Sequence, residues 1–149
     1  MLRILANDII TKTGEDVLLQ GWVSARRDHG GLTFFDLRDR SGKVQCVATN
    51  NETAKTLNME DVVEITGIVK QRPENMVNKK LKTGEYEVEI KNIKILSKSE
   101  SLPFDMGGEN LKTGMETMLD YRPLTLRHSS IAPIFRNQEK IVKSFREFL

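Results

Sequence analysis

The stretch Gly21–Gln45 reads Gly-Trp-Val-Ser-Ala-Arg-Arg-Asp-His-Gly-Gly-Leu-Thr-Phe-Phe-Asp-Leu-Arg-Asp-Arg-Ser-Gly-Lys-Val-Gln. It predicts three short strands joined by two turns, at residues 28–31 and 39–42. Asp and Gly are favoured in such turns because Asp bonds its own backbone and Gly tolerates positive φ. Basic side chains lie at or beside both turns: Arg26, Arg27, Arg38, Arg40 and Lys43.

The aromatic pair Phe34-Phe35 lies between these turns, and strand parity assigns its two rings to different faces. Phe35 shares a face with Leu37, which predicts the core, whereas Phe34 shares the other face with charged residues. Gln45 joins that polar face from the third strand. An exposed ring, guanidinium groups and an amide together are typical of a surface that stacks and reads nucleic-acid bases. Parity alone leaves open the alternative that Phe34 is ordinary core and the arginines form a solvated rim.

The order of elements predicts a mainly β fold, an OB-fold. This is a five-stranded Greek-key barrel with a short helix between strands 3 and 4, here with a C-terminal linker and helix. Alternation of apolar and polar residues predicts strands at 17–27, 62–69 and 85–95. Apolar residues at helical spacing predict a helix at 50–58, and polar composition predicts a loop at 71–84. Gly21 beside Trp22 predicts a bulge or bend in the first strand. Such barrels bind oligonucleotides on strands 2 and 3 and on the loops between strands 1 and 2 and strands 4 and 5.

Composition narrows the function classes. The chain has 149 residues, 38% hydrophobic and 30% charged, with a formal net charge of only +2, so a nucleic-acid surface must be a local patch. The chain has a single cysteine, Cys46, which excludes an internal disulfide framework and fits a reducing compartment. We expect Cys46 to be a buried, inert thiol. No apolar run is long enough to span a membrane. His29 and His128 lie far apart without nearby metal-ligand spacing, so we expect neither a metal site nor catalytic residues.

The C-terminal part of the chain differs in character from the barrel. We expect three regions: an OB-fold domain at 1–98, a linker or hinge at 99–130, and a helix at 131–149. The helix carries an apolar stripe at helical spacing: Ile141, Val142, Phe145, Phe148 and Leu149. Such a stripe needs another surface to cover it.

The segment Gly-Trp-Val followed by Arg-Arg-Asp-His-Gly-Gly-Leu-Thr-Phe-Phe-Asp-Leu-Arg-Asp-Arg-Ser-Gly resembles the anticodon-binding domain of bacterial-type aspartyl-tRNA synthetases, which are class II aspartate–tRNA ligases. Lysyl and asparaginyl enzymes share the Leu-Arg-Asp strand. The run Met118–Arg127 is similar to the start of that family's catalytic domain. It departs at Pro123 and Thr125, where the family has Tyr and Asp.

The resemblance implies roles for particular residues. Phe34 is expected to stack on the central anticodon base, with Gln45 and Arg27 serving the same base. Glu87 is expected to read the first base, a guanine, while Asn75 and Asn78 are weaker candidates for the third. The expected nucleic-acid-binding set is Arg26, Arg27, His29, Phe34, Gln45, Asn75, Asn78 and Glu87.

His29 and Gly30 carry an expectation about specificity. Members of the family that charge both tRNA-Asp and tRNA-Asn tend to have His then Gly after Arg-Arg-Asp, where strict members tend to have Leu. A tolerant parent enzyme would work with an amidotransferase that converts Asp-tRNA-Asn.

For the parent, the resemblance implies a cytoplasmic homodimer that attaches L-aspartate to tRNA-Asp with ATP and Mg²⁺. The catalytic motifs 2 and 3 would lie beyond Leu149. This chain is therefore expected to bind tRNA without catalysis and without a cofactor of its own. Two alternatives stay open: an independent OB-fold module for single-stranded nucleic acid, and a fragment of a lysyl- or asparaginyl-tRNA synthetase.

Overall fold

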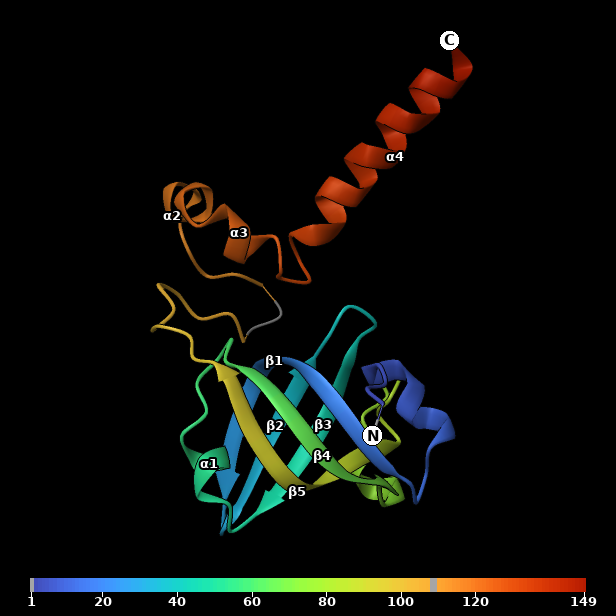
Figure 1. The fold of residues 1–149 in the computed structure, drawn as a ribbon. Coiled ribbons are helices and arrows are strands. Elements are labelled where there is room, and N and C mark those ends of the chain that lie inside the picture. Colours follow the sequence, from blue (N-terminus) through green and yellow to red (C-terminus); the bar gives the residue numbers. More distant parts are fainter. Residues whose placement is uncertain (1, 108–109) are drawn as a thin grey trace. The chain divides into compact units, whose positions relative to one another are not determined.

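Five strands close into a barrel in the computed structural model, which describes residues 2–107 and 110–149 (Figure 1). The strands are β1 (Asp16–His29), β2 (Leu32–Arg38), β3 (Lys43–Thr49), β4 (Val62–Gln71) and β5 (Tyr86–Ser97). A short helix, α1 (Glu52–Lys55), connects β3 to β4. The architecture confirms the predicted mainly β, five-stranded barrel with a helix between strands 3 and 4.

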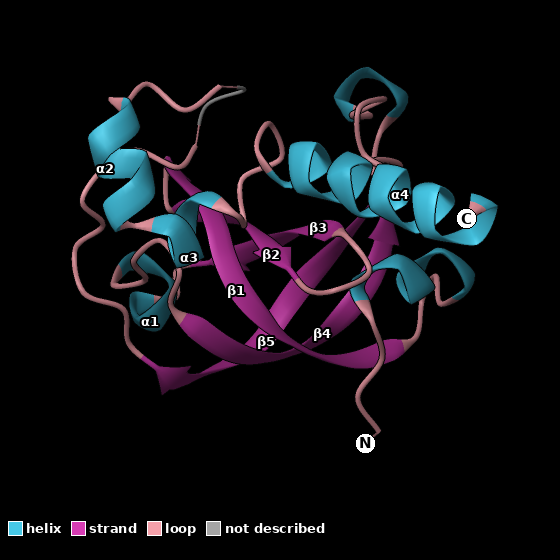
Figure 2. Ribbon diagram, turned by 90° about the horizontal axis from the view of Figure 1, so that it is seen from above, coloured by secondary structure: helices cyan, strands magenta, loops and turns pink. Residues whose placement is uncertain are grey.

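The barrel closes because β1 pairs on both of its edges. Residues 16–22 of β1 pair antiparallel with β4, and residues 22–29 pair antiparallel with β2. On the other side, β5 runs antiparallel to β4 and parallel to β3, which gives the ring order β1-β2-β3-β5-β4. Figure 2 shows the strands curving around a shared interior.

Gly21 marks the point where β1 passes from one partner to the other. A Cβ atom on Gly21 would lie 2.3 Å from the carbonyl oxygen of Arg38, so no other residue fits without moving the backbone. The sequence predicted a bulge or bend at Gly21 and Trp22. The register shift in fact falls between Val23 and Ala25, and Gly21 instead permits the close approach of β2.

The barrel interior follows the predicted alternation. Leu19, Phe35, Leu37 and Ile65 are each at most 1% exposed. Cys46 is also buried, as predicted, and burial raises the pKa of its thiol well above the ordinary value, so the thiol stays protonated and unreactive.

Two short helical segments contribute to the same core. Ala54 and Leu57 pack inward beside α1, whose first turn is capped by the Asn51 side chain accepting from the Ala54 amide at 3.0 Å. The 3₁₀ helix η1 (Ala6–Thr11) buries Ile9 fully. Capping and burial together explain why these segments order despite their short length.

Asp39 joins the N-terminal segment to the turn between β2 and β3. One carboxylate oxygen accepts the Ala6 amide at 2.7 Å, and the other accepts the amides of Ser41 at 2.7 Å and Gly42 at 3.2 Å. Burial alone would raise the pKa of Asp39, but these bonds and one from the Ser41 hydroxyl favour the charged form and lower it.

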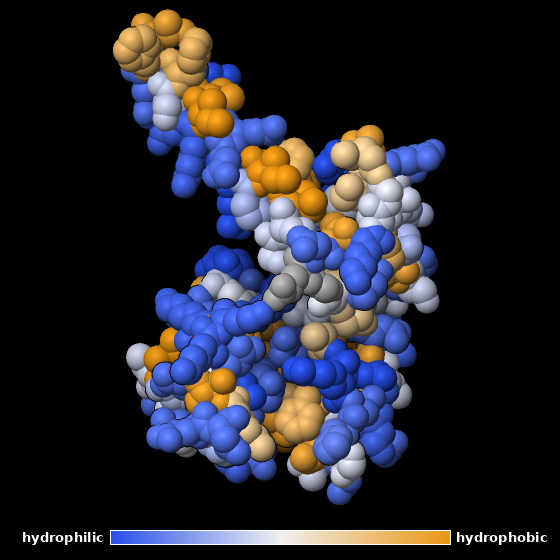
Figure 3. Space-filling model, turned by 180° about the vertical axis from the view of Figure 1, so that it is seen from behind, coloured by the Kyte–Doolittle hydropathy of each residue, from blue (hydrophilic) through white to orange (hydrophobic). Residues whose placement is uncertain are grey.

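The chain divides into two compact units, Met1–Ser101 and Leu102–Leu149. The second unit contains α2 (Met115–Asp120), α3 (Arg122–Thr125) and α4 (Ala132–Phe148). The predicted C-terminal helix is thus present, while the segment expected to be a linker holds two short helices. Figure 3 shows hydrophobic side chains along α4, where Ile141 is 68% and Phe145 65% exposed. Among the described residues, no helix has the length and apolar run needed to cross a membrane.

We expect Gly21→Ala to destabilise the barrel by about 1–3 kcal/mol, because the added methyl group must displace the Arg38 carbonyl. Urea unfolding followed by the fluorescence of Trp22, the single tryptophan of the chain, measures this effect in the barrel. Gly114→Ala is the matched control, since a Cβ there meets nothing within 4 Å. Equal urea midpoints for Gly21→Ala and the unchanged protein would contradict the close-approach argument.

Candidate nucleic-acid interface

An open pocket of about 420 Å³ lies on the outside of the barrel, where β1, β2 and β3 meet the segment after β4. Its lining consists of Arg27, Asp28, His29, Phe34, Gln45 and Arg72. Four of the eight predicted binding residues, Arg27, His29, Phe34 and Gln45, therefore lie around one hollow. They come from three different strands, so the barrel brings them together.

Phe34 provides the apolar wall of this pocket. It is half-buried, whereas Phe35 is 1% exposed, which confirms that the two rings take opposite faces of β2. Cross-strand pairing sets Phe34 directly beside Arg27 on β1 and Val47 on β3. A ring held in this way by the sheet can stack on a base without first losing much side-chain freedom.

Gln45 and Glu87 meet across the parallel pair β3–β5. The two residues are register partners, and the Gln45 amide nitrogen donates to a Glu87 carboxylate oxygen at 3.2 Å. Gln45 is only 8% exposed, so its amide is held in a defined orientation at the pocket floor. Amide and carboxylate side chains of this kind are suited to hydrogen-bonding base edges.

Arg72 completes the group, and sequence reasoning missed it. Its side chain is 11% exposed, its Nε lies 3.6 Å from the Glu87 carboxylate, and its guanidinium borders the pocket. Among the described residues, Arg72 Nε is the buried side-chain polar atom that has no hydrogen-bond partner. A buried donor without a partner is costly, and a ligand acceptor in the pocket would satisfy it. In the sequence, the feature that could have pointed to Arg72 is its position immediately before Pro73.

A second carboxylate, Asp36, lies on the same outer face as Phe34. Burial raises the pKa of Asp36, and the positive charges of Lys43, Arg27 and Arg72 oppose that rise. Asp36 and Glu87 thus partly neutralise the cations around the pocket. This explains how a basic patch fits in a chain of net charge +2.

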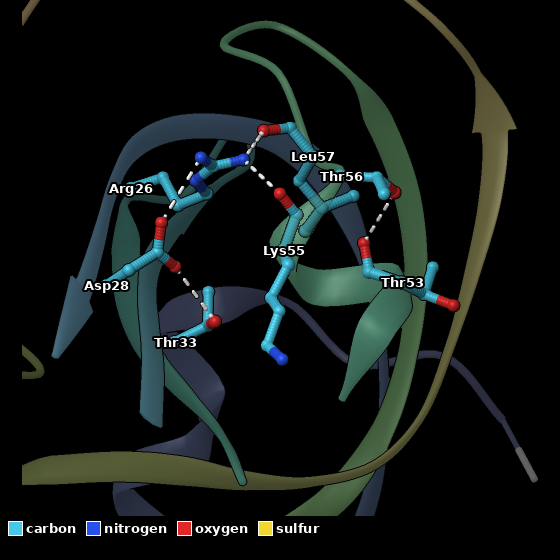
Figure 4. Close-up of polar contacts among 7 residues, drawn as sticks. All are labelled: Arg26, Asp28, Thr33, Thr53, Lys55, Thr56 and Leu57. Carbon is cyan, nitrogen blue, oxygen red and sulfur yellow. Dashed lines mark hydrogen bonds and ion pairs between the residues drawn. The ribbon is translucent and has the colours of Figure 1, made fainter. Parts of the chain in front are cut away.

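Arg26 belongs to the predicted binding set but does not line this pocket. It is the register partner of the inward-facing Phe35, and its guanidinium reaches the end of the barrel (Figure 4). There it donates to the carbonyl oxygens of Lys55 at 2.7 Å and Leu57 at 2.5 Å, and it pairs with Asp28 at 3.2 Å. Arg26 therefore anchors the C-terminal end of α1.

The two predicted asparagines lie in the β4–β5 loop and do not line the pocket. Asn75 belongs to the 3₁₀ helix η2 (Glu74–Met76) and is exposed. Asn78 organises the loop instead, because its side-chain oxygen accepts the Lys80 amide at 3.1 Å and its backbone bonds Leu81 and Gly84.

The turn between β1 and β2 is built from glycines. His29 ends β1, pairs with Leu32 and borders the pocket, while Gly30 and Gly31 have φ of 53° and 87°. These positive values favour glycine, which allows the turn to carry His29 at the pocket edge. Within residues 2–107 and 110–149, no group of three or more His, Cys, Asp or Glu side chains could hold a metal ion.

We expect Arg26→Ala to lower the free energy of unfolding by about 1.5–3 kcal/mol, because two backbone carbonyls at the end of α1 lose a charged donor. Arg27→Ala is the matched control: the neighbouring arginine is exposed and should leave stability within about 0.5 kcal/mol. Urea unfolding of both variants measures the difference. Equal destabilisation by the two changes would refute the structural role of Arg26.

Comparison with known proteins agrees with this geometry. Aspartate–tRNA ligase of Staphylococcus aureus (strain Newman) is 44% identical over 142 residues, covering 91% of this chain and 24% of that protein. The chain thus spans about a quarter of the length of the curated relatives it matches. Asparaginyl-tRNA synthetase of Pyrococcus horikoshii is 27% identical with a TM-score of 0.78, covering 100% of this chain and 34% of that one. Aspartyl-tRNA synthetase of Entamoeba histolytica shares the fold at 23% identity and TM-score 0.83, covering 99% of this chain and 37% of that one.

The family match falls on the barrel itself. Residues 17–96 match the tRNA anticodon family described as an OB-fold nucleic acid binding domain. The matched range contains every strand of the barrel except the first residue of β1 and the last residue of β5, and it contains the whole lining of the pocket. The chain therefore belongs to the tRNA anticodon family of OB-fold nucleic acid binding domains.

Proposed function

We propose that this chain is the anticodon-binding region of an aspartate–tRNA ligase and that the pocket reads the anticodon. One observation carries the proposal. The barrel gathers a half-exposed ring, guanidinium groups and an amide around one hollow, and the Glu87 carboxylate accepts from that amide, in a chain 44% identical to a bacterial aspartate–tRNA ligase. Stacking and edge recognition of unpaired bases commonly use side chains of these kinds.

Each side chain has a separate task in this proposal. Phe34 stacks on the central anticodon base, and Gln45 and Arg27 bond its edge or phosphate. Glu87 accepts hydrogen bonds from the first base, a guanine. Arg72 donates to an acceptor on the bound RNA, which satisfies the buried Nε. Asn75 and Asn78 contact the third base through the loop that Asn78 shapes.

The whole enzyme would then attach L-aspartate to tRNA-Asp, using ATP and Mg²⁺, as a homodimer in the cytoplasm. Within this chain the proposed organisation is a barrel at 1–98, a hinge at 99–130 and the first helix of the catalytic domain at 131–149. The chain itself binds tRNA and carries no catalytic residue. Its similarity to ligases over 91% of its length supports the assignment of the C-terminal helices to the same enzyme.

Two alternatives are less well supported. An asparaginyl-tRNA synthetase would fit the fold, but the identity to that enzyme is 27%, against 44% to aspartate–tRNA ligase. An independent single-strand-binding module would not need residues 102–149, yet the likeness to the Pyrococcus synthetase covers 100% of the chain.

We expect Phe34→Ala to weaken binding of the tRNA-Asp anticodon stem-loop by about 5- to 150-fold, the loss of one stacking contact worth about 1–3 kcal/mol. Fluorescence anisotropy with a labelled stem-loop measures this, and thermal unfolding should be almost unchanged. Phe35→Ala is the matched control, since loss of the buried ring should cost about 3–5 kcal/mol of stability. If Phe34→Ala instead unfolds the barrel, or binds as tightly as the unchanged chain, the stacking role is wrong.

The position of His29 at the pocket edge supports a second, finer proposal about selectivity. The tRNA-Asp and tRNA-Asn anticodons differ only in their third base, C or U. An imidazole can hydrogen-bond either pyrimidine, and Gly30 beside it leaves room. We infer that the enzyme accepts both tRNAs and acts with an amidotransferase that converts Asp-tRNA-Asn.

The selectivity proposal predicts that the chain binds stem-loops ending their anticodon in C or U with affinities within about tenfold, which corresponds to 1.4 kcal/mol. His29→Leu should raise the preference for C over U at the third base, because Leu cannot hydrogen-bond the base. Anisotropy titrations of both stem-loops with both proteins test this. A strong preference for C that His29→Leu does not increase would contradict the tolerant assignment.

A further inference from the structure

A second pocket, of about 390 Å³, lies elsewhere on the barrel surface and is lined by Arg3, Leu5, Trp22 and Arg40. It shares no lining residue with the anticodon pocket. None of these four side chains has a place in the proposed reading of the anticodon. The pocket therefore needs an explanation of its own.

The fold makes this pocket at the point where β2 parts from β1. Trp22 and Arg38 are the last paired residues of the two strands on this side. Beyond them, the N-terminal segment runs along the freed edge of β1, with a bridge from Arg3 to Leu18. The Arg3 guanidinium donates to the Gln20 carbonyl at 3.1 Å, which holds the side chain against β1. Trp22 and Arg40, the latter from the β2–β3 turn, line the pocket together with Arg3 and Leu5 of the N-terminal segment.

The charges of Arg3 and Arg40 are not offset by carboxylates. Among the described residues, neither arginine forms an ion pair, and both are exposed. Asp39, the carboxylate next to Arg40, directs both oxygens to the amides of Ala6, Ser41 and Gly42. Arg38 lies over the Trp22 ring at 5.9 Å but is bound to Glu60. Two exposed guanidinium groups beside a half-buried indole suit an anionic ligand with apolar rings.

The second pocket lies on the same outer face as the first. Along β2, Phe34 and Arg38 point outward with Asp36 between them, and their partners on β1 are Arg27 and Trp22. Four residues of extended strand span about 13 Å, which a few nucleotides of a single RNA strand can bridge. An RNA with bases in the first pocket can therefore reach the second with the nucleotides that flank those bases.

We propose that the pocket formed by Arg3, Leu5, Trp22 and Arg40 is a phosphate-backbone site for the nucleotides that flank the anticodon. Arg3 and Arg40 bind phosphate groups there, and Leu5 and Trp22 contact the neighbouring sugar or base. This site rests on the proposed function, because the first pocket sets where the RNA begins. It adds affinity and orientation without reading sequence, since phosphate contacts are the same for every base.

The test compares the salt dependence of stem-loop binding for the unchanged chain, Arg40→Gln and the double variant Arg3→Gln/Arg40→Gln. The plot of log K against log salt has a negative slope. Each lost phosphate contact should make that slope less steep by about 0.7–0.9. Affinity should fall by the same factor for anticodons of different sequence. Arg40→Lys should keep the slope, because a phosphate contact needs charge more than fork geometry. Arg40 makes no hydrogen bond that the described part of the structure records, so its replacement should not affect folding.

Two controls separate this site from the anticodon pocket. Lys94→Gln removes an exposed charge on the β4–β5 side of the barrel and should leave the slope unchanged. A bare trinucleotide of the anticodon sequence should bind the arginine variants as well as it binds the unchanged chain, because it lacks the flanking phosphates that the proposal places at these arginines. An unchanged slope and affinity in Arg40→Gln and in the double variant would overturn the backbone site. If Phe34→Ala also leaves stem-loop binding intact, the proposed function fails as well; if Phe34→Ala still weakens it, only the second site is lost.

Discussion

The close approach of β1 and β2 at Gly21 is the constraint on which the barrel depends. One continuous strand must leave β4 and join β2 within a few residues, and the two backbones meet where a Cβ would lie 2.3 Å from the Arg38 carbonyl oxygen. Gly67 permits a similar close approach between β4 and β5, because a Cβ on Gly67 would lie 2.3 Å from the Glu89 carbonyl oxygen. Both glycines allow strongly curved strands to close a small ring. Closure in turn brings β5 beside β3, which no local interaction would achieve.

The pocket that holds Phe34 and Gln45 is a direct consequence of that closure. The parallel β3–β5 pairing joins Gln45 to Glu87, and the segment leaving β4 adds Arg72 beside them. The resulting surface is mixed in charge, because Asp36 and Glu87 lie among Arg27, Lys43 and Arg72. Such a surface favours hydrogen bonds of defined direction to base edges over general attraction to any polyanion. The proposed backbone site, with its two arginines, would supply the general attraction to the RNA backbone.

Neighbouring arginines show how strand parity separates the side chains at the end of the barrel from those that line the pocket. Arg26 follows the inward face and bonds the carbonyls of Lys55 and Leu57, whereas Arg27 follows the outward face and borders the pocket. The same division separates Phe35 from Phe34. Asp39 and Arg40 differ in a similar way, since one is held by backbone amides while the other is exposed.

The sequence by itself determined the five-stranded order and the placement of Phe34 and Phe35 on opposite faces of their strand, because alternation has a period of two and is local. It also indicated the buried thiol of Cys46 and the terminal helix. It did not identify Arg72, and it did not foresee that Arg26, Asn75 and Asn78 lie outside the lining of the pocket that holds Phe34 and Gln45. These points share one cause. Which side chains meet depends on the pairing of β3 with β5 and on the path of the β4–β5 loop. Those depend on barrel closure between segments more than 40 residues apart in sequence, such as Gln45 and Glu87, and so only the tertiary structure decides them.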